Sequence, residues 1–246
     1  MFLDNLLPAS LGAIAAPMVF IKRLRYPEMV SFGLLASLAK MRSRKVIKDI
    51  DSIWDIGANQ GQFAFMAHHV WPHLPVYSFE PDPDTYKRLK KNFKRFHIPG
   101  ETFCCALSDK VESKFLQRYK DGVNNSLLER EIDIDTFLEH VTVDCTTLDK
   151  VSQPHLAKSA FLKLDVQGFE LVVLSGAVEF LKKCRYVQVE VSFSPAYAEA
   201  AHAGEIIVAM RGYGFECIEI LDLLRQNTGS RQIIEADLLF QRTDAH

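Results

Sequence analysis

The amino-acid sequence predicts a doubly wound α/β fold with a mostly parallel central sheet. Three observations support this prediction. Short apolar segments typical of buried strands alternate with helical segments from about residue 50 onward. A glycine-containing turn joins the first predicted strand to the first predicted helix. The last two predicted strands are joined by a polar link without a helix, which indicates one antiparallel strand near the C-terminus.

The first part of the chain differs in character, and we expect residues 1–49 to form an N-terminal helical extension of a domain at 50–246. One helical stripe contains Leu34, Leu35, Leu38 and Met41. The first 48 residues carry eight basic and two acidic side chains, a formal charge of +6, so the remainder carries −8. We expect the extension to cover the domain or to form a subunit contact in a homodimer. Weak contact with a membrane surface is the less favoured alternative.

The predicted elements of the domain follow one another in a regular order. We expect strands at 52–56, 76–79, 102–107, 141–144, 160–166, 186–191, 215–221 and 236–241, with helices at 60–71, 84–96, 169–181 and 195–211. Residues 108–140 show no periodicity that assigns them to an element. In open parallel sheets, ligands bind outside the carboxyl ends of the strands, so the residues at those ends are candidates for a functional site.

Composition narrows the class of protein. Of the 246 residues, 48% are hydrophobic and 24% are charged, which is typical of a globular domain and argues against disorder. A net charge of −2 gives no reason to expect a nucleic-acid partner. Five scattered cysteines form no CxxC pair and suggest reduced thiols in the cytoplasm. The uncharged stretch at 5–21 is short for a bilayer span and contains two prolines, so we expect it to pack against the protein.

The turn after the first strand is the first candidate for a cofactor site. It contains Asp55, Gly57, Ala58, Asn59 and Gly61. Gly57 allows a sharp turn and a close approach of the backbone to a ligand. Asn59 stands where such loops often have a second glycine, and Asn tolerates a positive φ. The N–H groups at the start of the next helix can bind a carboxylate.

The loop sequence can be compared with the requirements of two cofactors, a dinucleotide and S-adenosylmethionine. A dinucleotide fingerprint needs glycines at its first, third and sixth positions, which hold Gly57, Asn59 and Gln62 here. The carboxylate of Asp55 would repel a pyrophosphate, whereas the ammonium and sulfonium of S-adenosylmethionine suit an acidic strand end. We therefore expect S-adenosylmethionine as the cofactor, and an NAD-dependent oxidoreductase is the less favoured alternative.

The end of the second predicted strand supplies another anchor. Glu80 stands 19 residues after Gly61 and is followed by Pro81. An acidic side chain at this position can accept hydrogen bonds from both hydroxyls of a ribose. The glycine-containing turn, the acid before it and this second acid together predict a nucleoside-containing cofactor.

On these residues the chain resembles the FkbM family of methyltransferases. The matching segments are DIGANQG at 55–61, FEPD at 79–82, CALS at 105–108, TLD at 147–149, FLKLDVQGFE at 161–170 and VLSGA at 173–177, with the strand that ends in Glu190. The resemblance covers about residues 50–242. It implies a class I methyltransferase fold, which is Rossmann-like, and for several members methylation of a hydroxyl on a sugar or natural product. It also implies that Ala106 and Leu107 lie beside the adenine. Gln167 stands where the family commonly has Glu.

The ends of the later predicted strands supply candidates for catalysis and for substrate binding. Methyl transfer is an in-line displacement that depends mainly on positioning, but an alcohol must also lose its proton. Asp165 is the candidate base, and its alternative role is to orient the loop or cap the following helix. We expect Glu190 to bind the substrate together with Asn125 and Ser126. We do not expect Asp165 and Glu190 to hold a metal ion.

Several other polar side chains are better explained by packing. His68, His69 and His73 lie toward the far end of the first predicted helix, away from the strand ends. Lys163 alternates with buried leucines, so we expect it to be paired or to extend its amine to solvent. The sequence thus predicts a cytoplasmic, S-adenosylmethionine-dependent methyltransferase whose acceptor is a hydroxyl of a small molecule, sugar or glycan. A protein that binds S-adenosylmethionine without activity is the alternative.

Overall fold

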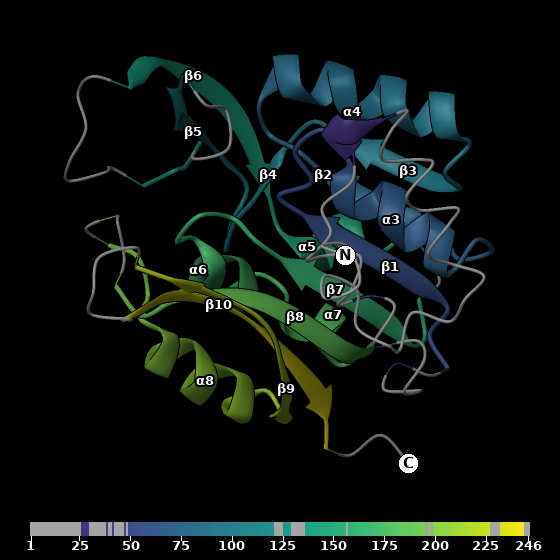
Figure 1. Cartoon of the computed structure of the whole chain (residues 1–246), viewed down its shortest axis with the longest axis vertical. Coiled ribbons are helices and arrows are strands. Elements are labelled where there is room, and N and C mark those ends of the chain that lie inside the picture. The colour runs from purple at the N-terminus through teal and green to yellow at the C-terminus, as the bar shows by residue number, and fades with distance from the viewer. Residues whose placement is uncertain are drawn as a thin grey trace, which may run out of the picture.

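The computed structural model describes residues 26–29, 38, 41, 47, 49–120, 125–128, 136–155, 157–194, 197, 199–226 and 232–243. Its central sheet has the strand order β3-β2-β1-β7-β8-β10-β9 (Figure 1). These strands are β1 (Ser52–Ile56), β2 (Val76–Phe79), β3 (Gly100–Phe103), β7 (Ala160–Leu164), β8 (Cys184–Ser192), β9 (Phe215–Arg225) and β10 (Ile233–Arg242). The first five run parallel, whereas β10 is antiparallel to both neighbours. The predicted fold class is confirmed, including its antiparallel strand.

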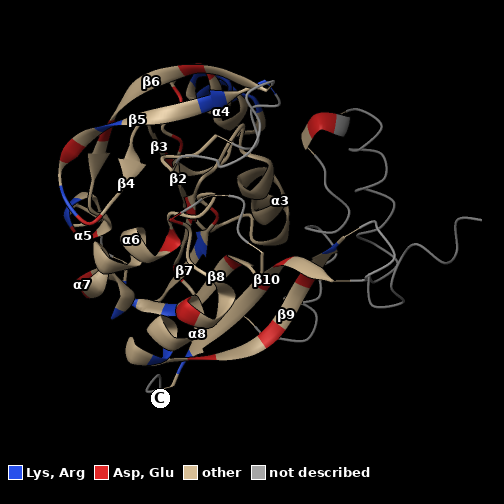
Figure 2. Ribbon diagram, turned by 90° about the vertical axis from the view of Figure 1, so that its left-hand side faces the viewer, with Lys and Arg blue, Asp and Glu red and all other residues tan. Residues whose placement is uncertain are grey.

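Helices cover both faces of this sheet. They are α3 (Gln62–Val70), α4 (Pro83–Phe96), α5 (Leu148–Val151), α6 (Glu170–Ser175), α7 (Val178–Leu181) and α8 (Ala203–Gly212), with a 3-10 turn η1 (Pro27–Met29). Neighbouring strand residues point to opposite faces. Ile53 therefore packs in the apolar cluster of α3 and α4, and Trp54 packs in the cluster of α5 to α8. Figure 2 shows α3 on one side of the strands and α6, α7 and α8 on the other.

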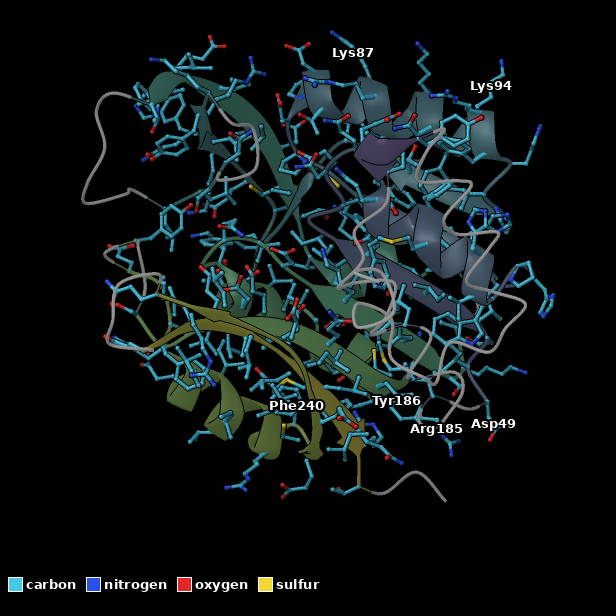
Figure 3. All side chains as sticks on the ribbon, in the orientation of Figure 1. Asp49, Lys87, Lys94, Arg185, Tyr186 and Phe240 are labelled. Carbon is cyan, nitrogen blue, oxygen red and sulfur yellow. The ribbon has the colours of Figure 1, made fainter. Side chains whose placement is uncertain are left out.

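Helix α4 illustrates how the local sequence sets an element. Asp82 begins the helix, and its carboxylate accepts hydrogen bonds from the Asp84 N–H and the Thr85 hydroxyl. Its buried side chains face the sheet, while Lys87 and Lys94 point away from the protein (Figure 3). The charged sequence of this helix therefore forms a solvated face, as the pattern predicts.

A second, smaller sheet departs from the sequence prediction. It contains β4 (Ala106–Leu107), β6 (Phe137–Thr146) and β5 (Glu112–Tyr119) in that order. The single strand predicted at 102–107 is wrong, because the chain leaves the central sheet after β3 and pairs β4 with β6. The strand predicted at 141–144 is the central part of a longer hairpin partner of β5. Part of 108–140 is thus a strand that periodicity does not reveal.

Two predicted helices are shorter than expected. The helix predicted at 169–181 is divided into α6 and α7, and Asp149 of α5 caps the start of α7. Its carboxylate accepts hydrogen bonds from the N–H groups of Glu179 at 3.0 Å and Phe180 at 2.7 Å. The helix predicted at 195–211 begins only at Ala203, and residues 195, 196 and 198 lie outside the described residues.

We expect Asp149→Ala to lower the free energy of unfolding by about 0.5–2 kcal/mol, because α7 loses its cap and two N–H groups lose their acceptor. Urea unfolding followed by circular dichroism measures this loss. Asp149→Asn keeps one acceptor oxygen and should cost less. Equal stabilities of the wild type and the Ala variant would contradict the capping role.

The described residues of the N-terminal segment contribute to the core on the α3 side of the sheet. Met29, Leu38, Met41 and Ile47 are buried in the same cluster as the apolar side chains of α3. The stripe residues Leu34 and Leu35, like the uncharged stretch 5–21, lie outside the described residues. The domain boundary between residues 49 and 50 remains a prediction. None of the helices in the described part of the chain has the length and apolar character needed to cross a bilayer.

Candidate active site

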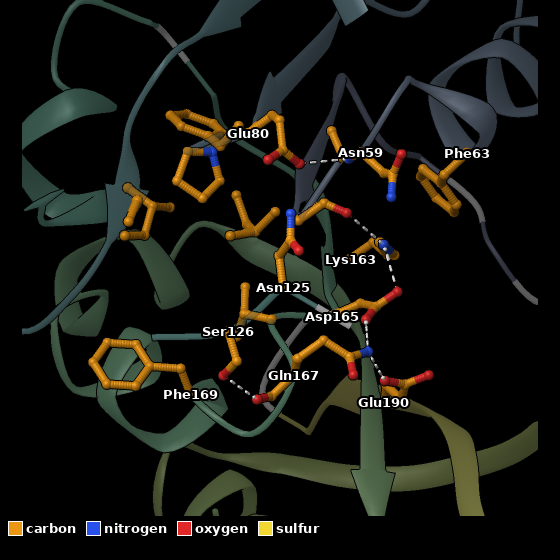
Figure 4. A pocket seen from close by; sticks show the side chains of 18 of the residues that line it. Asn59, Phe63, Glu80, Asn125, Ser126, Lys163, Asp165, Gln167, Phe169 and Glu190 are labelled. Carbon is orange, nitrogen blue, oxygen red and sulfur yellow. Dashed lines mark hydrogen bonds and ion pairs between the residues drawn. The ribbon is translucent and has the colours of Figure 1, made fainter. Parts of the chain in front are cut away.

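A cavity of about 370 Å³ lies at the carboxyl ends of the parallel strands (Figure 4). Eleven of the thirteen residues that the sequence singles out line it: Gly57, Ala58, Asn59, Glu80, Pro81, Ala106, Leu107, Asn125, Ser126, Asp165 and Glu190. The other two, Asp55 and Gly61, lie outside the lining. The folded sheet thus brings together residues that are distant in the sequence. Gly57 and Glu190, for example, are 133 positions apart and both line the cavity.

The loop after β1 has the backbone conformation that its sequence predicts. The φ angles of Gly57, Asn59 and Gly61 are +77°, +49° and +90°. The reason for Gly57 differs from the expected one, because a Cβ there would lie 1.8 Å from the carbonyl oxygen of Asp165. The missing side chain therefore leaves room for the end of β7 rather than for a ligand. Gly61 begins α3, and a Cβ there would lie 2.9 Å from the Leu89 side chain.

Glu80 joins this loop to the turn after β2. Its carboxylate accepts hydrogen bonds from the N–H of Asn59 and the N–H of Asp82, both at 2.9 Å. The side chain is buried but still lines the cavity. Burial raises the pKa of Glu80 to about 7, although the two N–H groups favour the charged form. Glu80 therefore shapes the cofactor loop and also presents carboxylate oxygens to the cavity.

This pKa predicts a pH-dependent affinity. We expect S-adenosylhomocysteine to bind wild-type protein more tightly as the pH rises from about 6 to 8, because ionised Glu80 accepts stronger hydrogen bonds from hydroxyls. The same raised pKa makes the free protein less stable as the pH rises from about 4.5 to about 7, because burial favours the protonated form of Glu80.

Calorimetric titration at several pH values measures the expected rise in affinity. Glu80→Gln should remove most of this rise. Glu80→Ala should weaken binding by about 1.5–3 kcal/mol. A Gln variant with the pH profile of the wild type would exclude Glu80 from the ligand site.

Asp55 is buried next to the cavity but does not line it. It is fully buried on β1, and its register partner on β7 is Lys163. The Lys163 Nζ lies 3.6 Å from Asp55 Oδ1 and 3.0 Å from Asp165 Oδ2, and it donates to the Gly57 carbonyl at 3.3 Å. The expectation that Lys163 is paired is confirmed. The structure therefore links Asp55 to the cavity through this lysine, whereas the sequence argument places its carboxylate beside the ligand.

These charges set the protonation of Asp165. Burial opposes its ionisation, but the adjacent Lys163 outweighs burial and lowers the pKa of Asp165. The same ion pairs raise the pKa of Lys163 despite its own burial. The ionised form of Asp165 is therefore favoured at neutral pH.

Gln167 connects Asp165 to Glu190. Its Nε2 donates to Asp165 Oδ1 at 3.2 Å and to Glu190 Oε2 at 3.0 Å (Figure 4). The negative charge of Asp165, followed by burial, raises the pKa of Glu190. The two carboxyl groups thus hold different protonation states at neutral pH. Among the described residues, no group of three or more His, Cys, Asp and Glu side chains is arranged to hold a metal ion.

The loop that carries these residues is held by hydrogen bonds with Glu170 and Ser126. Glu170 Oε1 accepts hydrogen bonds from the N–H groups of Val166 and Gly168, both at 3.1 Å. The Ser126 hydroxyl donates to the Gln167 carbonyl at 2.8 Å. Asp165 makes no cap to α6, whereas its bond to Gln167 orders the loop, so only the loop-ordering part of its alternative role agrees with the structure. The sequence argument does not predict the role of Glu170.

The second sheet forms the opposite side of the cavity. Asn125 Oδ1 accepts a hydrogen bond from the N–H of Tyr119 at 2.9 Å, which places Asn125 and Ser126 at the lining. Arg118 of β5 forms an ion pair with Asp82 at the start of α4. The insertion is therefore tied to the turn that contains Glu80. Asn124 lies outside the described residues.

Other residues are placed differently from the candidates. His68 and His69 lie in the last turn of α3 and are absent from the cavity lining, which agrees with a packing role. The lining also includes residues that sequence reasoning misses: Gln62, Phe63, Cys105, Gln167, Phe169, Gln188, Asp222 and Asp237. Most of these lie on strands or loops whose neighbours only the folded sheet defines.

The cavity suits S-adenosylmethionine. Its volume lies within the range of small-molecule sites. Phe79, Ala106 and Leu107 supply an apolar wall for a flat base. Glu80 supplies an acceptor for ribose hydroxyls, and the acidic strand ends suit a cationic ligand.

Comparison with known proteins agrees with this geometry. A family model described as the methyltransferase FkbM domain matches residues 55–217, more than half of the chain. The 31-O-demethyl-FK506 methyltransferase FkbM of Streptomyces tacrolimicus is 26% identical over 211 residues, which cover 74% of this chain and 79% of that protein. The hexuronic acid methyltransferase AglP of Haloferax volcanii is 28% identical over 144 residues, covering 57% of this chain and 56% of that protein.

These matches decide between the alternatives left open by the loop sequence. The matches favour a methyltransferase over both a dinucleotide-dependent oxidoreductase and a binding protein without activity. The predicted resemblance and cofactor are confirmed. The chain belongs to the FkbM family of methyltransferases and uses S-adenosylmethionine as its cofactor.

Proposed function

We propose that the enzyme methylates a hydroxyl group of a small molecule, sugar or glycan. The single observation that carries this proposal is the ionised Asp165 carboxylate in the cavity wall, held by Lys163 on one oxygen and by Gln167 on the other. An alcohol needs a base of this kind in order to become a nucleophile. The names of two relatives, which mention 31-O-demethyl-FK506 and hexuronic acid, agree with a hydroxyl-bearing substrate and not with a nucleic acid.

Different residues of the chain bind the cofactor, accept the proton and position the acceptor. When bound, S-adenosylmethionine would supply the methyl group as an electrophile, its S–CH3 bond breaking to leave S-adenosylhomocysteine. The loop at 57–59 and Glu80 would hold the ribose, and Ala106 and Leu107 would lie against the adenine; all of these residues line the cavity. Asp165 accepts the proton of the acceptor hydroxyl as the oxygen attacks. Lys163 keeps Asp165 ionised before this step, and Glu190, Asn125 and Ser126 position the acceptor.

Product formation tests the proposed function. The protein is incubated with S-adenosylmethionine and a panel of sugars, glycosides and hydroxylated metabolites, and mass spectrometry detects an added methyl group. Transfer to hydroxyls is the expected result. Transfer to nitrogen or sulfur acceptors alone would contradict it, and cofactor binding without any product would favour a binding protein.

We also propose a cytoplasmic location and a role for residues 1–49 as an extension that covers the domain or joins two subunits. All five cysteines are free thiols in the structure, which suits a reducing compartment. The buried Met29, Leu38 and Met41 support a packing role over membrane contact.

Vesicle binding tests this preference. In co-sedimentation with anionic vesicles, we expect the full chain to bind no more strongly than a chain that starts at Asp49. Strong, salt-sensitive binding by the full chain alone would favour the membrane alternative, since basic residues near an anionic surface attract it. Size-exclusion chromatography of the same two chains shows whether the extension forms a homodimer.

A further inference from the structure

We propose that the acceptor carries a protonated amine near the hydroxyl that is methylated, and that a row of carboxyl groups on β8, β10 and β9 binds this amine. The row consists of Glu190, Asp237 and Asp222. This inference rests on the proposed function, because it assigns an acceptor class to the same cavity.

The sheet register defines the row. On β10, Asp237 lies directly opposite Glu190 of β8 and directly opposite Asp222 of β9. Directly paired residues of antiparallel strands point to the same face of a sheet. All three side chains line the cavity, and Figure 2 shows acidic residues on both β9 and β10.

The row leads from the reacting site to the surface. Gln167 bonds Glu190 to Asp165, so one end of the row adjoins the proposed base. Glu190 and Asp237 are half-buried, and Asp222 is exposed. An acceptor that enters past Asp222 would therefore meet the three carboxyl groups in turn before its hydroxyl reaches Asp165.

A buried amide beside the row points to a donor-bearing ligand. Gln188 is 1% exposed and lines the cavity, and it donates a hydrogen bond to Asp237. Its Oε1 has no hydrogen-bond partner within the described part of the chain. An unsatisfied buried acceptor is costly, so this oxygen favours a ligand with N–H or O–H groups. An ammonium offers three donors and no acceptor.

The charge of the row supports a cation. Asp237 and Asp222 are placed directly opposite each other on neighbouring strands, and like charges in such a pair repel. Lys163 is the one Lys or Arg among the described lining residues, and it is already paired with Asp55 and Asp165. Burial and the charge of Asp165 raise the pKa of Asp237 to about 6. Among the described lining residues, the row thus has no unpaired positive partner.

Other ligands fit less well. A carboxylate or phosphate would be repelled by the row and would find no free cation among the described lining residues. The three acids lie along a line across neighbouring strands, and they form no arrangement suited to a metal ion among the described residues. A neutral polyol would satisfy Gln188 but would leave the charges unpaired.

Three related sugars test the proposal: relative to glucose, glucosamine carries an ammonium at C2 and glucuronate carries a carboxylate at C6. Each is titrated calorimetrically into full-length protein saturated with S-adenosylhomocysteine, near neutral pH and in the presence of a chelator. We expect glucosamine to bind at least about tenfold more tightly than glucose, and glucuronate to bind most weakly. Added salt should reduce the preference for glucosamine.

Isosteric variants assign the preference to the row. Asp237→Asn should remove most of the advantage of glucosamine over glucose, and Asp222→Asn should remove less, because Asp222 is exposed. Glu216→Gln is the matched control, since Glu216 lies on the same strand as Asp222 but outside the cavity lining. It should keep the full advantage. Thermal unfolding and S-adenosylhomocysteine binding confirm that each variant is folded.

The outcomes separate this inference from the proposed function. Cofactor-product binding without a preference for glucosamine overturns the amine site and leaves the methyltransferase intact. A preference for glucuronate does the same and would place the acceptor with the hexuronic acid named for one relative. A preference that survives both Asn variants also overturns the row. Failure to bind S-adenosylhomocysteine would remove the proposed function and the amine site together.

Discussion

Asp165→Asn should lower kcat by about 10²–10⁴-fold, the usual contribution of a general base, while S-adenosylhomocysteine affinity changes little. The substitution keeps the size and planarity of the side chain but removes the charge that accepts a proton. Lys163 retains its contacts with Asp55 Oδ1 at 3.6 Å and with the Gly57 carbonyl at 3.3 Å, so the variant does not leave the buried ammonium without a partner. The loss should therefore appear in turnover and not in folding.

Product assays under saturating cofactor measure this effect. Asp144→Asn is a matched control, because it removes an exposed carboxylate on β6 outside the cavity lining. Full activity of Asp165→Asn would limit Asp165 to ordering its loop. A large loss of cofactor affinity would move it to the cofactor site. Loss of wild-type activity with a chelator would favour a metal held by Asp165 and Glu190.

Gly57→Ala should abolish S-adenosylhomocysteine binding and destabilise the protein by at least about 2–3 kcal/mol. The new Cβ would lie 1.8 Å from the Asp165 carbonyl oxygen, and its φ of +77° disfavours any residue with a Cβ. Either β1 and β7 must separate at their ends or the loop must change conformation. Both changes would displace the loop from Glu80, which accepts a hydrogen bond from it.

Calorimetry and thermal unfolding of this variant test the close approach. Gly204→Ala is the matched control, because a Cβ at Gly204 meets no atom within 4 Å. It should leave both cofactor affinity and stability almost unchanged. Normal binding and stability of Gly57→Ala would show that the two strand ends are not in close contact.

The parts of the site that the sequence predicts well are those encoded by neighbouring residues. The strand, turn and helix around Gly57 are consecutive, so local propensities and the need for a positive φ define them together. Glu80 follows the next buried strand, and strand ends of a parallel sheet meet at one edge. The same rule places Asp165 and Glu190 correctly in the cavity lining.

The parts that the sequence misses depend on pairing between distant segments. The run at 102–107 has one continuous strand pattern, but β4 leaves the central sheet because β6, some forty residues later, supplies its partner. The row of Glu190, Asp237 and Asp222 requires the register of three strands, and a shift of one residue would turn side chains to the other face.

The sequence by itself determined the fold class, the family and the cofactor, because these depend on periodicity and on short motifs whose geometry is local. Only the tertiary structure decided which charged side chains lie in contact with one another. It places Asp55 behind Lys163, gives Gln167 the two carboxyl groups that it bridges, and assigns the space beside Gly57 to the Asp165 backbone. Electrostatic energies depend on distance and burial, and both are properties of the folded chain rather than of its sequence.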